Sequence, residues 1–144
     1  PSNTILFETR GLPALMLHVA FLLAIAGSIW GIWALKAFDP FGRSNIAARL
    51  GGKQLRASQF TVCGPYLWVR HPLYFFMLIL IWSTPSMTTD RLLFNMLWTA
   101  WLALGSYLEE KDLASEFGEA YLHYQNAVPM LLPWRGPVGS EWRV

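Results

Sequence analysis

Residues 11–35 read GLPALMLHVAFLLAIAGSIWGIWAL and contain no Asp, Glu, Lys or Arg. About 20 apolar residues are enough for a helix to cross the hydrocarbon core of a bilayer, so this stretch predicts a membrane-spanning helix. Arg10 and Lys36 stand at its two ends, and Pro13 suits the first turn of a helix. The run is longer than the apolar region of a secretory signal peptide, and Glu8 precedes it, so a cleaved signal is not expected.

The composition of the whole chain is that of a membrane protein. Of 144 residues, 54% are hydrophobic and 14% are charged, whereas soluble domains carry about 25% charged residues. The net charge of +2 gives no reason to expect a nucleic-acid partner. The only cysteine, Cys63, excludes an internal disulfide, and the sequence contains no obvious set of metal or haem ligands. We therefore predict no metal site.

Two further uncharged runs predict a helical hairpin. The first covers residues 71–89 and is expected to end near Pro85, and the second covers residues 92–108 with Asp90 as its N-cap. Together with the first run they predict an all-α integral membrane bundle with three transmembrane helices. The chain is then a single membrane domain, 1–144, whose spans cover residues of about 12–36, 72–85 and 91–109.

The distribution of basic residues predicts the orientation of these helices. Segment 39–70 contains five Lys or Arg residues against one acid, whereas the turn of the hairpin is followed only by Asp90 and Arg91. Basic loops stay on the cytoplasmic side. We therefore expect a cytoplasmic loop at 39–70, an external N-terminus, and a cytoplasmic tail at 110–144.

The cytoplasmic tail begins with a predicted amphipathic helix. After residue 108 the chain becomes strongly charged, and Leu113, Phe117, Tyr121 and Tyr124 follow at helical spacing. Such spacing places one apolar face along the helix. Gly118 weakens this helix, which is expected to end before residue 129.

This topology brings three groups of chemically active side chains to the inner membrane boundary. Each group alone has an ordinary explanation as an interfacial anchor, a solvated helix face or amphipathic packing. Together they predict a polar, aromatic-lined pocket at the cytoplasmic interface. The groups are Arg70 with His71, Glu109 with Glu110, and Tyr121 with Tyr124.

The two adjacent acids carry an additional signal. Acids at the C-terminal end of a helix oppose the negative end of its dipole. Glu109 and Glu110 therefore indicate that the helix continues beyond them or that a cation lies nearby. Arg70, His71 or a bound cation could serve as that partner.

The first span carries two other features. Gly27 and Gly31 form a GxxxG step, which allows close packing against another helix. His18 is an ionisable group inside an apolar run, and such groups often have a function. Its place near the outer boundary favours a neutral histidine instead.

Four segments, taken in order, resemble the isoprenylcysteine carboxyl methyltransferase and phospholipid methyltransferase superfamily of integral membrane enzymes. They are GPYLWVRHPLY at 64–74, EEKDL at 109–113, FGEAYLHY at 117–124 and VPMLLP at 128–133. Together with FDPFG at 38–42, the last segment looks most like the bacterial NnrU-type and methanethiol S-methyltransferase branch. The resemblance covers residues 38–133.

The resemblance implies an enzyme of the bacterial inner membrane. It implies that S-adenosylmethionine binds on the cytoplasmic side and that a methyl group passes to a small thiol or lipidic acceptor. Members of the branch usually carry further N-terminal helices, so the sequence is interpreted as a shortened member or a fragment of one. The implied catalytic residues are Arg70, His71 and Tyr74. The implied cofactor-binding residues are Tyr66, His71, Glu109, Glu110, Tyr121 and Tyr124.

One position departs from the family pattern. The pattern reads Arg-His-Pro-x-Tyr-x-Gly, and Phe76 stands in place of that glycine. Glycine often allows a backbone or ligand to approach closely, so the ring either fills part of the cofactor pocket or faces lipid or a partner helix. The departure leaves a second hypothesis open. In it, the chain is a non-catalytic membrane subunit or assembly factor that binds other membrane subunits through its apolar helices.

Overall fold

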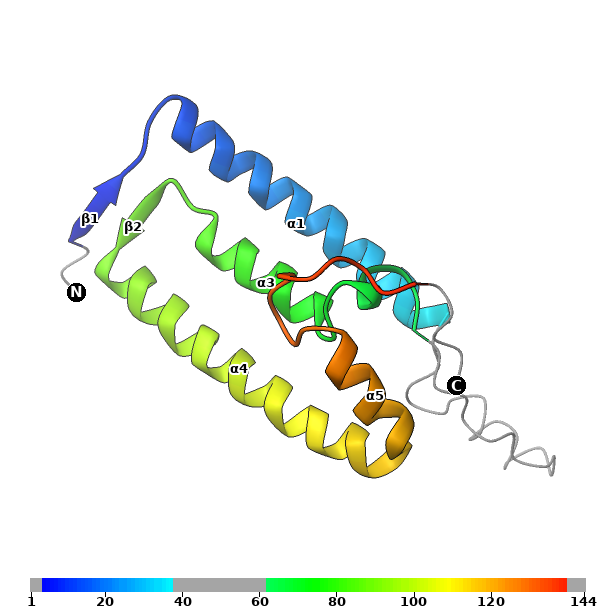
Figure 1. Cartoon of the computed structure of the whole chain (residues 1–144). Coiled ribbons are helices and arrows are strands. Elements are labelled where there is room, and N and C mark those ends of the chain that lie inside the picture. Colours follow the sequence, from blue (N-terminus) through cyan, green and yellow to red (C-terminus); the bar gives the residue numbers. More distant parts are fainter. Residues whose placement is uncertain (1–3, 38–61, 140–144) are drawn as a thin grey trace, which may run out of the picture.

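The computed structural model describes residues 4–37 and 62–139 and is mostly helical within them (Figure 1). Most of the predicted loop at 39–70, and the family segment at 38–42, lie outside the described residues. Two short strands were not predicted by the sequence analysis. The elements in chain order are β1 (Ile5–Glu8), α1 (Leu12–Ala37), η1 (Gly64–Leu67), α3 (Pro72–Trp82), β2 (Ser86–Thr88), α4 (Thr89–Phe117) and α5 (Glu119–Ala127).

Helix α1 packs against α3 through the GxxxG step. A Cβ atom at Gly27 would overlap the ring of Phe76, and one at Gly31 would lie 2.8 Å from Cδ2 of Leu73. Only glycine permits the two helices to approach this closely. The predicted packing role of the GxxxG step is therefore confirmed. The ring of Phe76 faces a partner helix, and that helix belongs to the same chain.

Helices α3 and α4 form the predicted hairpin, but their lengths differ from the prediction. Helix α3 has 11 residues and ends at Trp82, before the predicted limit at residue 85. Helix α4 has 29 residues and continues past the acidic pair to Phe117. Its N-cap is Thr88, whose hydroxyl accepts the backbone N–H of Arg91 at 3.3 Å. The predicted cap at Asp90 was wrong by two residues, because the threonine that ends β2 already supplies the capping oxygen.

We call the end where α3 ends and α4 begins the outer end of the hairpin, after the predicted orientation, and the opposite end the inner end. Hydrogen bonds between uncharged groups close the outer end. Asn95, which is 1% exposed, donates from Nδ2 to the carbonyl of Ile81 at 2.9 Å. This bond satisfies one of the carbonyls that α3 leaves unpaired where it ends. Trp82 donates from Nε1 to Oγ1 of Thr99 at 3.1 Å. Two polar side chains of α4 therefore hold the end of α3 in place.

Strands β1 and β2 tie the N-terminal segment to the hairpin turn. They pair antiparallel, with Ile5 opposite Thr88 and Glu8 opposite Ser86. The backbone N–H of Thr9 then donates to the carbonyl of Pro85 at 2.8 Å. The start of α1 therefore lies beside the turn between α3 and α4, as Figure 1 shows.

Among the described residues, one segment, Leu12–Leu35 in α1, is long and apolar enough to cross a membrane. Helix α3 is apolar but short, so the prediction of three spans is not confirmed. Large apolar side chains are nevertheless exposed along α1 and α4. They include Leu15, Leu22, Leu23 and Trp33 on α1 and Leu93, Leu97, Trp101 and Leu104 on α4.

At the other end, α5 folds back toward the start of α3. Helix α4 ends at Phe117, and its C-cap is Gly118, whose φ of 55° lies in the left-handed region that glycine adopts readily. Helix α5 then buries Tyr121 and Tyr124 with Val62 and Val128 in a small core. The predicted amphipathic helix is therefore two helices with a sharp turn between them.

Candidate functional site

The segment that carries Arg70 and His71 is fixed by its backbone. The N–H of Arg70 donates to the carbonyl of Pro129 at 2.9 Å, and the N–H of His71 donates to the carbonyl of Met130 at 3.1 Å. His71 is the N-cap of α3, and Pro72 occupies the first turn, where its missing N–H costs nothing. The C-terminal segment and α3 together therefore hold both side chains at the inner end of the hairpin.

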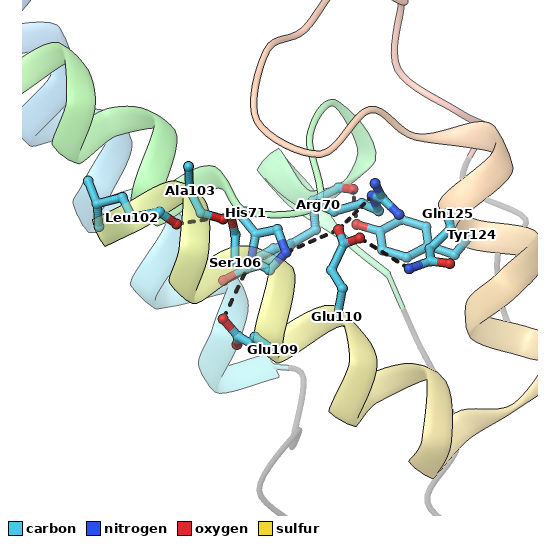
Figure 2. A network of polar contacts seen from close by, with 10 residues as sticks. Arg70, His71, Leu102, Ala103, Ser106, Glu109, Glu110, Tyr124 and Gln125 are labelled. Atoms are coloured by element: carbon cyan, nitrogen blue, oxygen red, sulfur yellow. Dashed lines mark hydrogen bonds and ion pairs between the residues drawn. The ribbon is translucent and has the colours of Figure 1, made fainter. Parts of the chain in front are cut away.

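Glu110 is the centre of a buried polar cluster (Figure 2). It comes from α4 and is 8% exposed. Its Oε1 atom lies 3.2 Å from Nε2 of His71 and 3.1 Å from Nε of Arg70. Its Oε2 atom accepts a hydrogen bond from Nε2 of Gln125 at 3.1 Å. A buried carboxylate requires such partners, because an unpaired buried charge is strongly unfavourable.

The structure thus brings the Arg-His pair and the acidic pair together, as the hairpin topology predicts. Glu109 completes the arrangement, because its Oε2 atom lies 3.6 Å from Nδ1 of His71. The imidazole therefore lies between two carboxylates, one buried and one whose side chain is 47% exposed. Tyr74 stacks on the imidazole with 5.5 Å between ring centroids and 3° between ring planes.

One donor of the cluster lacks a hydrogen-bond acceptor. Nε of Arg70 is buried and within ion-pair distance of Glu110, but it makes no hydrogen bond with any described residue. The positive charge of the guanidinium is compensated by Glu110, but the N–H does not point at the carboxylate oxygen well enough to form a hydrogen bond. The cluster therefore holds more hydrogen-bonding capacity than the described contacts use.

Three tyrosines, two from α5 and one from η1, pack near the cluster. Tyr124 donates its hydroxyl hydrogen to the carbonyl of Tyr66 at 2.7 Å, and Tyr121 packs edge-on against Tyr124. Burial and the nearby charge of Glu110 raise the pKa of Tyr121, and burial also raises the pKa of Tyr124. Burial and then the charge of Glu109 raise the pKa of Tyr66 to about 12. All three phenols are therefore neutral near pH 7 and act through packing and hydrogen bonds.

Gln125 was missed by the sequence analysis. It follows Tyr121 by four residues, so it lies on the same face of α5 as that buried ring. The helical spacing that identified Tyr121 could have identified it. Among the described residues, no group of three or more His, Cys, Asp or Glu residues is arranged to hold a metal ion.

An open apolar pocket of about 290 Å³ lies where α1, η1, α3 and the C-terminal segment meet, and no residue of the cluster lines it. Its walls include Val69 and Pro72, the two residues that flank Arg70 and His71 in the sequence. Phe76 also lines it. The residue that departs from the family pattern therefore contacts α1 and this apolar space.

Several proteins named methanethiol S-methyltransferase are similar to the chain. One from a Pseudomonas species is 51% identical over 119 residues, which are 79% of this chain and 46% of that protein. Methanethiol S-methyltransferase 2 of Bradyrhizobium diazoefficiens is 34% identical over 137 residues, 92% of this chain and 51% of that protein. The methanethiol S-methyltransferase of Mycobacterium tuberculosis is 31% identical over 139 residues, 89% of this chain and 57% of that protein.

The chain therefore spans about half the length of the curated relatives it matches. No protein-family model matches it, and no solved structure matches it significantly. These relatives identify the chain as a member of the isoprenylcysteine methyltransferase-like superfamily. Within that superfamily, the chain belongs to the methanethiol S-methyltransferase branch.

Proposed function

We propose that this chain carries the donor-binding part of a membrane methyltransferase that transfers a methyl group from S-adenosylmethionine to a small thiol. The observation that carries the proposal is the buried cluster of Arg70, His71, Glu110 and Gln125. Relatives with the name methanethiol S-methyltransferase support the reaction class. A cluster of paired charged groups next to a half-exposed carboxylate can bind a polar ligand.

The residues present fit the chemistry of S-adenosylmethionine. Its carboxylate needs a cationic donor, and the guanidinium of Arg70, which is paired with Glu110, would supply the positive charge. Its ammonium and ribose hydroxyls need acceptors, and Glu109 presents a carboxylate that is about half exposed. We assign Arg70 and Glu109 to hold these groups. Tyr66 and the α5 tyrosines, Tyr121 and Tyr124, support this pocket.

When bound, S-adenosylmethionine supplies an activated methyl group, and the remaining task of the protein is to orient the acceptor and remove its proton. In the tautomer that carries its hydrogen on Nε2, His71 donates to Oε1 of Glu110, and Nδ1 is then the proton acceptor. The stacked ring of Tyr74 holds the imidazole in this orientation. His71 is then the general base for the thiol, and the exposed carboxylate of Glu109 stabilises the imidazolium.

The proposal places the reaction at the inner face of a bacterial inner membrane, with the lipid bilayer as the main partner of the helices. The three spans are α1, α3 with the turn that follows it, and α4. The apolar composition of α1 and the exposed apolar side chains of α4 support this arrangement. The N-terminus is then outside, and the cluster and α5 are cytoplasmic, as the basic segment 39–70 indicates.

The contact between α1 and α3 weakens the subunit hypothesis. Gly27 and Gly31 are covered by Phe76 and Leu73 of the same chain, so this step is not an open face for another subunit. Phe76 packs against α1, so helix packing explains why a phenylalanine stands where the family pattern has a glycine. We therefore favour the enzyme.

The test is turnover with isotopically labelled S-adenosylmethionine and methanethiol in nanodiscs, with dimethyl sulfide measured in the headspace. We expect turnover by the wild type and at least a tenfold loss in Glu110→Gln. Glu116→Gln, at an exposed position of the same helix, is the matched control and should match the wild type. Absence of turnover in a wild-type protein that is folded would contradict the proposal.

A further inference from the structure

The ion pair between Arg70 and Glu110 does not have the geometry that its chemistry favours. A guanidinium and a carboxylate pair best through two parallel N–H···O bonds, because the fork of N–H groups matches the two carboxylate oxygens. Here both side chains are 10% exposed and Nε of Arg70 lies 3.1 Å from Oε1 of Glu110, yet its N–H makes no hydrogen bond with any described residue. Another contact must therefore hold the carboxylate out of the fork.

Gln125 provides that contact, because it binds the other oxygen of the same carboxylate. Its Nε2 atom donates to Oε2 of Glu110 at 3.1 Å, while Oε1 lies between Arg70 and Nε2 of His71 (Figure 2). The last torsion of a Glu side chain is broad, so a contact at each oxygen is needed to fix the plane of the carboxylate. The amide on α5 supplies the second of these contacts.

Helix α5 holds Gln125 in a fixed place. The preceding residue, Tyr124, is 3% exposed and donates its hydroxyl hydrogen to the carbonyl of Tyr66 at 2.7 Å. Tyr121, four residues before Gln125, is 1% exposed in the same small core. The amide is also uncharged, so it orients Glu110 without changing the charge of the cluster. A fixed and uncharged donor is suited to positioning a carboxylate.

The orientation of Glu110 bears on which nitrogen of His71 carries the hydrogen. Nε2 of His71 lies 3.2 Å from Oε1 of Glu110, within hydrogen-bond range, whereas Nδ1 lies 3.6 Å from Glu109, which is too far for a hydrogen bond. The hydrogen bond made by one ring nitrogen sets the tautomer of a histidine. A carboxylate held toward Nε2 therefore favours the hydrogen on Nε2 and leaves Nδ1 to accept a proton.

Building on the proposed function, we propose that Gln125 is a positioning residue for His71 and acts through Glu110. It keeps the carboxylate out of the fork with Arg70 and directed at Nε2 of the imidazole, so that Nδ1 remains the base. The unsatisfied N–H of Arg70 follows from this arrangement, because the carboxylate is shared with α5. Without Gln125, the carboxylate rotates into the fork, which satisfies that N–H and removes the acceptor from Nε2.

The first experiment measures the tautomer and needs neither donor nor thiol. The other two histidines, His18 and His123, are exposed, so a His18→Leu, His123→Gln background with a histidine-free tag leaves His71 as the only imidazole. Nitrogen-15 NMR in nanodiscs distinguishes ring nitrogens with and without hydrogen, and is recorded at about pH 8, where imidazoles are mostly neutral. We expect hydrogen on Nε2 in about 90% of the background protein and in about 50% of Gln125→Leu.

Two further variants separate the hydrogen bond from general effects on α5. Asn126→Leu is the matched control, because this side chain is exposed and follows Gln125 on the same helix. It should keep the hydrogen on Nε2. Gln125→Asn keeps the amide but is one methylene too short to reach Glu110, so it should resemble Gln125→Leu. All variants should melt within about 5 °C of the background, because the fork with Arg70 replaces the lost bond.

The second experiment measures turnover and donor affinity in the otherwise wild-type chain. Gln125→Leu should lower kcat at least tenfold, because half of the imidazoles then carry the hydrogen on the wrong nitrogen and the rest are no longer held in place. The Kd for S-adenosylmethionine should change less than threefold, because the positive charge of Arg70 remains. Asn126→Leu should match the wild type in both quantities.

These measurements separate the positioning role from the proposed function. A tautomer that depends on Gln125 in a protein without turnover would contradict the proposed function and leave the positioning role standing. An unchanged tautomer or an unchanged kcat in Gln125→Leu would overturn the positioning role, as would hydrogen on both nitrogens of His71 in the background protein. Failure of both Gln125 variants to fold, while Asn126→Leu folds, would also overturn it, because Gln125 would then be required for folding.

Discussion

The two ends of the α3–α4 hairpin are built with different chemistry. At the outer end, the neutral side chains of Asn95 and Trp82 donate one hydrogen bond each, and Thr99 both accepts from Trp82 and donates to the carbonyl of Asn95. At the inner end, Glu110 gathers a guanidinium, an imidazole and an amide, and a buried N–H of Arg70 still lacks an acceptor among the described residues. The outer end has the polar groups that closing a hairpin requires. The inner end has more polar and charged groups than closing a hairpin requires, and a binding site needs such additional groups.

The largest expected effect concerns the side of the membrane on which each end lies. In a Cys63→Ser background, Ser86→Cys at the outer end should react with a membrane-impermeant thiol reagent from outside only. Ser115→Cys, at an exposed position past the inner end, should react only after the cells are opened. The expectation rests on the basic composition of segment 39–70, because basic loops stay on the cytoplasmic side of the membrane. Labelling of both cysteines from the same side would remove the distinction between an outer and an inner end.

The next largest effect concerns the buried charge of Glu110, which distinguishes the inner end from the outer end. Glu110→Ala leaves Arg70 and His71 buried without their shared carboxylate, and breaking a buried ion pair in this way costs about 3–5 kcal/mol. We expect a lower Tm and a loss of S-adenosylmethionine binding. Glu116→Ala is the control, because that side chain is exposed on the same helix. Equal thermal stability of the two variants would mean that the cluster does not stabilise the fold.

Phe76 tests whether helix packing and donor binding are separate. Replacing a core phenylalanine by a small residue costs about 3–5 kcal/mol, and because this ring is only partly buried we expect Phe76→Gly to cost about 2–3 kcal/mol. Affinity for S-adenosylmethionine should stay unchanged, because the ring packs on Gly27. Calorimetry and a thermal melt on the same sample measure both. Tighter donor binding in Phe76→Gly would show that the ring fills the donor pocket and would revive the subunit hypothesis.

The smallest effect belongs to the outer end. Asn95→Leu removes the hydrogen bond to the carbonyl of Ile81, which we expect to cost about 1–2 kcal/mol. Donor binding and methyl transfer should be retained once the protein is folded. A thermal melt and a turnover assay in nanodiscs provide the comparison. Loss of turnover without loss of stability would mean that the outer end also takes part in function.

Local sequence signals predicted the features that depend on short-range pattern. The uncharged runs gave α1 and the hairpin, and antiparallel helices necessarily bring residues 70–71 and 109–110 to the same end. The features that were missed depend on contacts between distant segments. Ile5 lies before α1 and Thr88 lies between α3 and α4, so their pairing joins segments that are far apart in the sequence. No local pattern indicates this pairing.

Gln125 and the apolar pocket illustrate the same limit of local pattern at the site. The bond from Gln125 to Glu110 requires the sharp turn at Gly118, which folds α5 back along α4. The pocket requires η1 to lie against α1, and this contact depends on a backbone conformation at Gly64. Both arise from how helices are placed relative to one another. Composition and periodicity describe single helices and carry little information about that placement.

The central claim is that the inner end of the hairpin binds S-adenosylmethionine, and calorimetry tests it most directly. S-adenosylmethionine is titrated into the wild type, Glu110→Gln and Asn95→Leu in nanodiscs, up to a concentration near one millimolar. We predict single-site binding to the wild type and Asn95→Leu, and at least tenfold weaker binding to Glu110→Gln. No binding to folded wild type, or equal affinity in Glu110→Gln, would contradict the account.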